Sequence, residues 1–501
     1  MISQSRTRIN DLRLLCLALP GWVLPVALGA ALRLVNLGSE RLWYDETFTA
    51  YLTKLDWAHL WPAILGDNHP PTWYAVEWFW SRLFGTSEAA LRLPAALLSI
   101  LAIYLMWRLA LRLTLDIRTA QVAALLLAIL PSSLYYAQEA RMYSLFLVGG
   151  LLFLEGLIRR RSWRIVVGGL ALAYAHNVGV IYVLVGGLAL LIRDRRDPVR
   201  LPRDVMALLG VVAGWAPWAV VGIAAQMRQV YSGFWLPPLQ VGDSLFPFLS
   251  MSVGTRLSDP LQFIAYAGWL AAVGVALIAS RCWLRSGRGR LFLAMSLGVP
   301  AATILVSLLW RNVYVARTML AAVCLLVIPL AWALTHLARP NRRVLVLVTT
   351  VTLALGLTAH YFPDANRGRG ATDTWLTPIE QGWKPGDVVY HLAVDSAIGV
   401  SYYLPGKASA LLPESNDLGQ SLTDQTKQAM GFFQVKFDAL ASHGFRRAWL
   451  IVNDSPMISA YELAVWADIL KRYPATLVNK DDPQAGLAPS YMYLIPLSEV
   501  F

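Results

Sequence analysis

The chain has 501 residues, of which 57% are hydrophobic and only 15% charged. A soluble protein of this length would carry about a quarter charged residues, so the composition excludes a soluble globular protein and indicates a polytopic membrane protein. The net charge of +12 comes from short groups of arginines between apolar segments, which argues against nucleic-acid binding. Cys16, Cys282 and Cys324 have no paired spacing and predict neither a disulfide framework nor a zinc site.

Eleven apolar segments are predicted to cross the membrane. The first, residues 14–34, lacks the cleavage site of a signal peptide and is predicted to be a retained span. Arginines precede it and recur at alternate turns, which places the N-terminus in the cytoplasm and the C-terminus outside. The other expected spans are 91–107, 120–135, 144–158, 205–225, 261–280, 291–310, 318–337 and 344–361, with two more on either side of His176. A helix pair within the loop 226–260 would raise the number to thirteen.

The composition changes near residue 362, where the apolar segments shorten to strand length. Three segments are predicted to be strands: residues 387–393, 447–452 and 491–496. A helix with Ser455 as its N-cap and Pro456 at its first position is predicted to run to about Arg472. This order predicts a small α/β domain with a partly parallel sheet. We therefore expect a helical transmembrane catalytic domain over residues 1–361 and an extracytoplasmic α/β domain over residues 362–501.

The first outer loop, residues 35–90, combines carboxylates with the tryptophans and tyrosines that are typical of a membrane–water interface. Two interfacial helices are predicted in it, one over about 51–64 and the other over 73–84. The pair Asp45-Glu46 is its first acidic feature. A carboxylate in this loop could act as a general base if it reaches the proton that it removes. The alternative, which the sequence supports equally, is a solvated pair or the N-cap of a helix that begins at Thr47.

Asp67, Asn68 and His69 are the second acidic feature of the loop and directly precede two prolines. Asp67 and His69 could share a divalent cation, with His176 as a further candidate ligand, but two ligands are fewer than a metal site needs. A turn that ends at the double proline, with Asp67 as its cap, is the favoured interpretation.

A third polar group, residues 138–143, has the sequence QEARMY and lies between two predicted spans. Ionisable residues at such depth usually face a protein interior and mark a substrate path. Arg141 could bind a phosphate through its planar guanidinium, or it could pair with Glu139. Further polar residues on predicted outer turns are His176, Asn177, Arg311 and Arg317. Such a pattern is expected of a pocket that holds a lipid phosphate against a carboxylate base.

Several motifs occur in a fixed order: WYDE, DNHPPTWYAVEWFW, RLFGTSEAALRLPAAL, QEARMYSLF and AHNVGV. Together they resemble the GT-C superfamily of integral-membrane glycosyltransferases. The resemblance is strongest to the branch that contains protein O-mannosyltransferases and the lipid A aminoarabinose transferase. It covers roughly residues 30–190, and the stretch VYVARTML resembles a later family motif that contains an arginine. The tryptophan-rich WWD signature of oligosaccharyltransferases is absent from the sequence, which argues against transfer of a preassembled glycan.

The resemblance implies transfer of a sugar from a polyprenyl-phosphate carrier to an acceptor at the outer face of the membrane. It implies that Asp45 is the catalytic base and Glu46 its acidic neighbour. Arg141 and Arg317 would lie near the lipid phosphate. The remaining donor-site candidates are Glu139, Tyr143 and His176, and the candidates for an acceptor or structural loop are Asp67, Asn68 and His69.

We therefore predict an inverting glycosyltransferase of the inner membrane that acts on a lipid, glycan or protein hydroxyl. No cofactor is firmly implied, and a divalent cation is the single candidate. The main alternative is a lipid or solute transporter without transferase chemistry. Transporters usually contain internal repeats and ionisable residues at the bilayer midplane. Here the sequence has no clear repeat, and its ionisable residues collect at one predicted face. A non-catalytic scaffold would not require acidic residues and arginines to gather there.

Overall fold

The computed structural model describes residues 20–227, 236, 238–240, 245–254, 259–361, 372–413, 427–428, 430–453, 459–481 and 490–497. The chain divides into two compact units. The first unit comprises Met1–Val35, Ala95–Gly214 and Leu239–Tyr361, and the second comprises Asn36–Pro94, Trp215–Pro238 and Phe362–Phe501. Each unit is therefore built from three separate stretches of chain.

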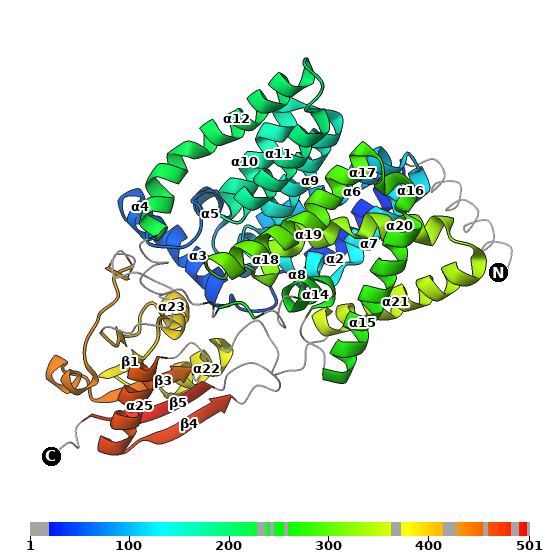
Figure 1. Cartoon of the computed structure of the whole chain (residues 1–501). Helices are drawn as coiled ribbons and strands as arrows, with labels where there is room; N and C mark the ends of the chain where they lie inside the picture. Colours follow the sequence, from blue (N-terminus) through cyan, green and yellow to red (C-terminus); the bar gives the residue numbers. More distant parts are fainter. Residues whose placement is uncertain are drawn as a thin grey trace. The chain divides into compact units, whose positions relative to one another are not determined.

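The first unit is helical (Figure 1). Its longer helices are α2 (Val23–Leu34), α7 (Ile117–Ile129), α9 (Tyr143–Arg159), α10 (Ser162–Ala175), α11 (Gly179–Asp194), α15 (Asp259–Ala279), α18 (Val299–Leu309), α20 (Val327–His336) and α21 (Arg339–Tyr361). Its shorter helices are α8 (Pro131–Ala137), α14 (Phe246–Val253), α16 (Arg281–Leu284), α17 (Gly287–Leu293) and α19 (Leu320–Leu325). Two further helices, α6 (Glu88–Thr114) and α12 (Arg200–Trp218), begin or end in the second unit.

Six helical stretches in the described part of the chain are long and apolar enough to cross a membrane. They are Glu88–Thr114, Arg200–Met227, Pro260–Ala279, Gly287–Leu309, Ala316–His336 and Arg339–Tyr361. The pair α7 and α8, bent by 58°, would make a seventh. The remaining predicted spans contain helices of 12 to 17 residues, namely α2, α9, α10 and α11. The total of eleven spans thus stays a prediction.

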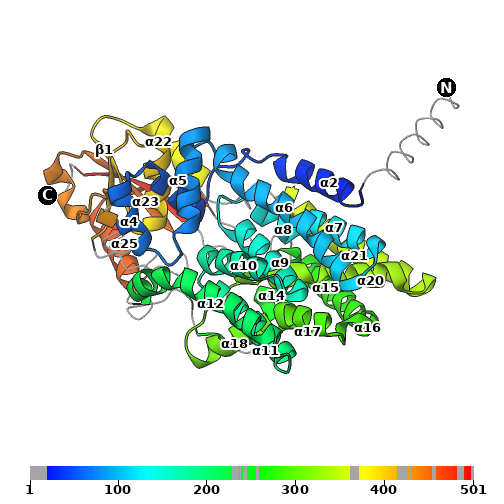
Figure 2. The same cartoon turned by 90° about the horizontal axis from the view of Figure 1, so that it is seen from above.

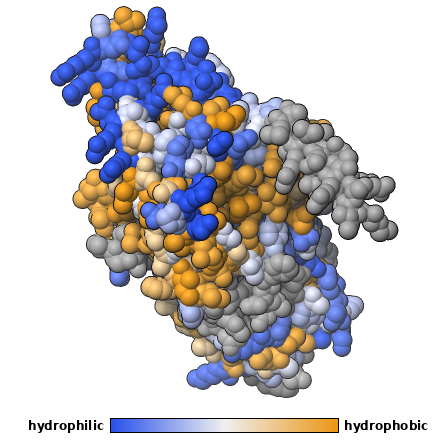
Figure 3. All heavy atoms as spheres, turned by 90° about the vertical axis from the view of Figure 1, so that its right-hand side faces the viewer, coloured by the Kyte–Doolittle hydropathy of each residue, from blue (hydrophilic) through white to orange (hydrophobic). Residues whose placement is uncertain are grey.

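Large apolar side chains are exposed on many helices of the first unit. Examples are Leu184, Leu188, Met206, Phe263, Ile278, Leu309 and Leu347, each more than 60% exposed. Figure 3 shows such residues as broad apolar areas on one face of the molecule. Apolar surface of this extent is rare on soluble proteins and is the normal surface of a protein in lipid.

Helices α9 and α10 pack closely because glycines line their contact, and both views of the cartoon show them side by side (Figures 1 and 2). A Cβ atom added at Gly168 would lie 2.4 Å from the backbone nitrogen of Phe153, and one at Gly149 would lie 2.9 Å from that of Leu172. Small residues let two backbones approach in this way, which is a common form of helix association in membranes.

Ion pairs join the ends of these helices at two buried carboxylates. Glu155 accepts hydrogen bonds of 2.9 Å from Arg108 of α6 and from Arg164 of α10. Asp194, at the end of α11, accepts two from Arg160, the shorter measuring 2.5 Å. These arginines belong to the groups that the sequence predicts on cytoplasmic turns. They therefore form ion pairs between helices and are not fully solvated.

The second unit begins with three short helices: α3 (Tyr44–Lys54), α4 (Trp57–Leu65) and α5 (Thr72–Phe84). The prediction of one helix over 51–64 is wrong, because two helices meet there at Leu55-Asp56. The side chain of Asp56 accepts the N–H of His59 over 2.9 Å and so caps α4. The predicted helix over 73–84 is confirmed as α5.

The C-terminal stretch of this unit forms a five-stranded sheet with the order β2-β1-β3-β5-β4. The strands are β1 (Asp387–His391), β2 (Ser409–Leu411), β3 (Arg447–Asn453), β4 (Thr476–Asp481) and β5 (Ser490–Pro496). Strand β1 pairs in parallel with β2 and β3, whereas β5 is antiparallel to β3 and β4. The three predicted strands and the partly parallel arrangement are confirmed, and β2 and β4 were not predicted.

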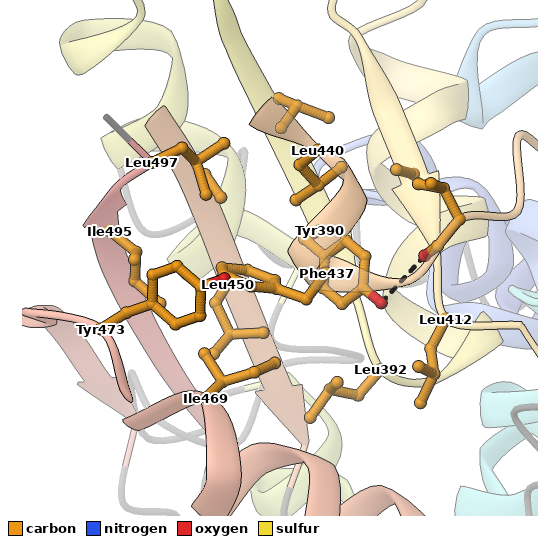
Figure 4. Packing of buried hydrophobic residues seen from close by; sticks show 14 of the residues in the cluster. Tyr390, Leu392, Leu412, Phe437, Leu440, Leu450, Ile469, Tyr473, Ile495 and Leu497 are labelled. Carbon is orange, nitrogen blue, oxygen red and sulfur yellow. Dashed lines mark hydrogen bonds between the residues drawn. The ribbon is translucent and has the colours of Figure 1, made fainter. Parts of the chain in front are cut away.

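Helices cover both faces of this sheet, because alternate residues of β1 and β3 point to opposite sides. On one face, Tyr390 and Leu450 pack with residues of α25 (Ala460–Arg472) in the cluster drawn in Figure 4. On the other face, Val389 and Trp449 pack with α22 (Thr372–Gly382) and α23 (Val394–Tyr403). Full burial of one such large apolar side chain contributes about 1.5–3 kcal/mol.

The N-terminus of α25 differs from the prediction. The N-cap is Ser459, whose hydroxyl accepts the N–H of Glu462 over 3.1 Å, while the Glu462 carboxylate accepts the N–H of Ser459 over 2.7 Å. This reciprocal capping box starts the helix at Ala460. The predicted cap, Ser455, lies outside the described residues, and the predicted end at Arg472 is confirmed.

Candidate active site

Asp45 and Glu46 lie in the first turn of α3. Trp43 is the N-cap, with an extended backbone, and its N–H donates to Glu46 Oε2 over 3.4 Å. The partial positive charge at a helix N-terminus favours carboxylates in this position. The pair thus lies inside the helix, which begins at Tyr44, and does not cap a helix that begins at Thr47.

Arg92, on α6, fixes the chain around this pair. Its Nε donates to Glu46 Oε1 and its Nη2 to Glu46 Oε2, both over 2.8 Å. The same guanidinium donates to the backbone carbonyls of Leu37, Glu40 and Arg41 over 2.8 to 3.1 Å. Arg92 is 1% exposed and Glu46 is fully buried. A buried bidentate pair of this kind holds the entry to α3 in one geometry.

The two carboxylates therefore have different surroundings. Glu46 is bound to Arg92 inside the protein and is fully buried. Asp45 is half-buried and thus partly open to the surface. Of the two predicted catalytic residues, Asp45 is the one that a substrate could reach.

Glu77, on α5, is a buried carboxyl that the sequence analysis missed. It is fully buried, and within the described part of the chain neither of its oxygens has a hydrogen-bond partner. Burial raises its pKa well above the usual range, and the nearby Glu46 carboxylate raises it further. The protonated form of Glu77 is therefore favoured relative to an exposed glutamate, and the residue lies near the Glu46 carboxylate.

Asp67 organises the turn before α5. Its Oδ2 accepts the Tyr74 hydroxyl over 2.5 Å and the backbone N–H of His69 over 3.1 Å, and it lies 3.0 Å from His69 Nδ1. Gln226 Nε2 donates to the carbonyls of Asp67 and His69 over 2.8 and 3.1 Å. Asn68, between them, is half-buried. The favoured interpretation, a turn capped by Asp67, is confirmed.

The cation interpretation of this turn has weak support. Asp67 Oδ2 already accepts hydrogen bonds from neutral donors. Among the residues that the structure describes, no three His, Cys, Asp or Glu side chains are placed to hold a metal ion. Asp67 and His69 therefore fit a hydrogen-bonded turn better than a metal site.

The second candidate group lies in the first unit, between α8 and α9. Glu139 is fully buried and Arg141 is 2% exposed, and the Arg141 N–H donates to the Glu139 carbonyl over 2.7 Å. The preceding residue, Gln138, donates its amide to the carbonyls of Arg33 and Val35 at the end of α2. The expected location of this segment in a protein interior is confirmed.

Tyr143 links this segment to Arg317, and Phe146 on the same helix contacts His176. The Arg317 guanidinium lies 6.0 Å from the centre of the Tyr143 ring. One turn further along α9, Phe146 contacts the ring of His176 at 6.3 Å and that of Tyr182 at 5.0 Å. The Tyr182 hydroxyl donates to the carbonyl of Thr318, next to Arg317, over 2.8 Å. The first unit thus brings three of the predicted donor-site residues, Tyr143, His176 and Arg317, into one aromatic cluster.

Arg33, at the end of α2, is a buried arginine that sequence reasoning also missed. It donates to Ser99 and Ser133 over 2.8 Å and to the carbonyls of Leu127 and Ala128 over 3.3 and 2.9 Å. These carbonyls belong to the last turn of α7, where the bend to α8 leaves them without helical partners. Arg33 and Arg92 each stand alone within an apolar segment of the sequence. An isolated arginine in such a segment is the feature that could have identified both residues.

Comparisons with known proteins agree with this architecture. Residues 68–221 match the family model described as dolichyl-phosphate-mannose-protein mannosyltransferase. A sequence comparison with curated proteins finds no match.

Structural similarity extends over nearly the whole chain. ArnT from Cupriavidus metallidurans bound to undecaprenyl phosphate matches with a TM-score of 0.62 and 16% identity, over 95% of this chain and 98% of that one. Its apo structure matches with a TM-score of 0.62, 15% identity and coverage of 95% and 97%. The arabinofuranosyltransferase AftD from Mycobacteria matches with a TM-score of 0.51 and 14% identity, over 95% of this chain but 40% of that one.

The fold is therefore that of the integral-membrane glycosyltransferases of the GT-C superfamily, and the resemblance predicted from the sequence is confirmed at this level. Within that class, the chain is similar to ArnT along almost its full length.

Proposed function

We propose that the chain is an inverting glycosyltransferase that moves a sugar from a polyprenyl-phosphate carrier to an acceptor hydroxyl. The observation that carries this proposal is Asp45, a half-buried carboxylate whose helix is fixed by the buried Glu46–Arg92 pair. The shared fold with ArnT, one structure of which contains undecaprenyl phosphate, supports the choice of donor.

In the proposed reaction, Asp45 removes the proton from the acceptor hydroxyl. The acceptor oxygen forms a bond to the anomeric carbon while the bond from that carbon to the phosphate oxygen breaks. The polyprenyl phosphate leaves with the electron pair. Attack on the face opposite to the leaving group inverts the anomeric configuration.

Arg141 and Arg317 are the proposed ligands of the donor phosphate. Guanidinium groups match phosphate oxygens in shape and charge, and they would stabilise the negative charge that develops on the leaving group. Tyr143 and His176 belong to the same cluster as Arg317, which supports a role for them beside the donor. Glu139 lies two residues before Arg141, and we propose that it orients this segment.

The membrane topology belongs to the same proposal. We propose eleven spans over residues 1–361, a cytoplasmic N-terminus, and an outer α/β domain over residues 362–501. Asp45 would then act at the outer face of the membrane, where the acceptor is a lipid, a glycan or a protein.

The test is sugar transfer by the purified full chain with Asp45→Asn, which removes the base and keeps the shape of the side chain. We expect transfer to fall at least 100-fold, while the variant retains the wild-type melting temperature and binding of undecaprenyl phosphate. Asp56→Asn is the matched control, because Asp56 is an exposed cap and asparagine is also a good N-cap. A panel of polyprenyl-phosphate sugars with lipid and peptide acceptors supplies the substrates.

Turnover by Asp45→Asn at the wild-type rate would exclude Asp45 as the base. Lipid translocation by the wild-type chain without transfer of any sugar would favour a transporter instead.

A further inference from the structure

Helix α3, which carries Asp45, contacts the C-terminal sheet region within the second unit. Its principal neighbour there is α23, which follows strand β1. The last two residues of α23, Tyr402 and Tyr403, extend their side chains to the segments that flank α3 and α5. Residues 316 and 361 positions apart in the sequence thus form one packed structure.

Tyr403 binds the chain just before α3. Its hydroxyl accepts the backbone N–H of Leu42 over 2.8 Å and donates to Glu88 Oε1 over 3.0 Å. Leu42 is fully buried, and its carbonyl accepts the Thr47 hydroxyl over 3.0 Å. The two hydrogen bonds of the Leu42 backbone lie three residues before Asp45 and link that segment to the first turn of the helix.

The same segment is held from a second element by Arg92, which binds the carbonyls of Glu40 and Arg41 and the carboxylate of Glu46. Arg92 and Tyr403 therefore bind opposite hydrogen-bonding groups of one short stretch, carbonyl oxygens and an N–H respectively. The Arg41 carbonyl and the Leu42 N–H belong to one planar peptide group, so Arg92 and Tyr403 hold this group from its two sides.

The remainder of α3 is bound to the C-terminal region by other groups. The Tyr51 hydroxyl donates to the carbonyl of Met430 over 2.7 Å. Lys54 Nζ donates to the carbonyl of Tyr402 over 3.2 Å and lies 3.9 Å from the centre of the Tyr402 ring. These contacts hold the later part of the helix, whereas the Tyr403 contact is at the end that carries Asp45.

We propose that Tyr403 is a positioning residue for Asp45. The C-terminal sheet region would then contribute directly to the geometry of the proposed base. This inference rests on the proposed function. The base must meet the acceptor proton within hydrogen-bond reach. A displacement of about 1 Å at a reacting group can cost about 100-fold in rate. Loss of the Tyr403 hydroxyl would remove its hydrogen bond to the Leu42 N–H and allow such a displacement.

Tyr403→Phe tests the proposal, because it removes one oxygen and keeps the ring. We expect kcat to fall about tenfold or more, with KM for the donor within twofold of wild type, because the donor ligands are unchanged. Amide hydrogen exchange at Leu42, measured residue by residue on the purified full chain, should become faster. Exchange in strand β1 should stay as in the wild type, which would show that the sheet remains folded.

Two neighbouring tyrosines provide matched controls. Tyr402→Phe loses a hydroxyl that donates to the carbonyl of Thr86, and Tyr51→Phe loses the bond to Met430. Neither hydroxyl binds the segment before Asp45. We expect both controls to retain wild-type kcat within about twofold and wild-type exchange at Leu42.

Unchanged exchange at Leu42 in Tyr403→Phe would overturn the proposal, whatever the activity. Faster exchange with a wild-type kcat would overturn the positioning role. An equal loss of kcat in Tyr51→Phe would overturn it as well, since the effect would then come from general loosening. Absence of sugar transfer by the wild-type chain would overturn the proposed function and the positioning role together, and exchange at Leu42 would still report on the contact itself.

Discussion

Arg92 illustrates how one buried side chain determines where a neighbouring functional group lies. Two of its hydrogen bonds go to Glu46 and three to backbone carbonyls of the preceding segment. The guanidinium is out of reach of water, so its charge depends on Glu46 for compensation. Removal of one member of a buried pair leaves the other charge uncompensated, which is far more costly than the loss of an exposed pair.

We therefore predict that Arg92→Met destabilises the protein by about 3–5 kcal/mol. Unfolding in detergent, followed by circular dichroism and by hydrogen exchange over residues 37–46, measures the effect. Arg472→Met is the matched control, because Arg472 pairs with Asp438 at the surface and should contribute about 1 kcal/mol or less. The double variant Glu46→Met/Arg92→Met should be more stable than Arg92→Met alone, and a double variant of lower stability would contradict the explanation.

The sequence indicates candidate site residues more readily than the residues that support them. Asp45, Arg141 and Arg317 stand out because charged groups near a membrane are costly, and the order of the motifs adds a family resemblance. Glu77 and Arg92 do not stand out, since each lies among apolar residues without a neighbouring charge. Their partner, Glu46, lies 31 and 46 positions away in the sequence. A contact over such a distance is set by tertiary packing, which one sequence does not specify.

At the level of elements, the packing of α5 against α3 places the Glu77 carboxyl beside Glu46. The free energy of this packing should depend on pH. Because burial raises the pKa of Glu77 in the folded state, its contribution to stability is complete below the unfolded pKa of about 4.5. The contribution is lost as the pH rises through the folded pKa. High pH should thus weaken the packing of these two helices.

Glu77→Gln should remove this dependence, because glutamine resembles the protonated carboxyl. We expect the variant to be at least as stable as the wild type at pH 7 and increasingly more stable toward pH 9, measured as the melting temperature in detergent. Glu380→Gln, at an exposed position of α22, should follow the wild-type curve. Parallel curves for Glu77→Gln and wild type would exclude Glu77 as the titrating group.

Elements with a strong local signal were predictable, and those that depend on tertiary contacts were not. Strands β1 and β3 are continuous apolar runs, as buried parallel strands usually are. Strand β2 has three residues, and β4 exposes Leu477 and Val478, so neither shows a clear alternation. The bend between α7 and α8 was likewise missed, although Pro131 marks it. At this bend, Arg33 donates hydrogen bonds to carbonyls of the last turn of α7. Those carbonyls lie 94 and 95 positions away from Arg33 in the sequence.

At the level of the whole molecule, the stability of the second unit includes the stability of the C-terminal sheet that it contains. His391, in β1, is fully buried between Ser396 and Ser409, whose hydroxyls lie 2.9 and 3.0 Å from its ring nitrogens. Burial lowers the pKa of His391 to about 3. A lowered folded pKa contributes stability above the unfolded value of about 6.5, and this stability is lost as the pH falls toward the folded value.

We predict that the C-terminal sheet loses about 1.4 kcal/mol of stability per pH unit below pH 6.5 through this residue. Hydrogen exchange in β1 and β3 at pH 7, 6 and 5 measures the loss. His391→Gln should show a smaller slope, although it is less stable at pH 7 because the hydrogen bonds to the two serines change. His443→Gln, at an exposed position, should match the wild type. An equal slope in His391→Gln would assign the acid sensitivity to other groups.

The link between Leu42 and Tyr403 spans 361 positions of the chain. At the usual rate of protein synthesis, about 5–20 residues per second, the ribosome needs roughly 20 to 70 s to travel from one to the other. Throughout that interval the nascent chain carries Asp45, the proposed base, whereas the tyrosine that would position it has not yet been made. Under the proposed positioning role, a chain that has not reached Tyr403 would transfer sugar more slowly than the longer chain.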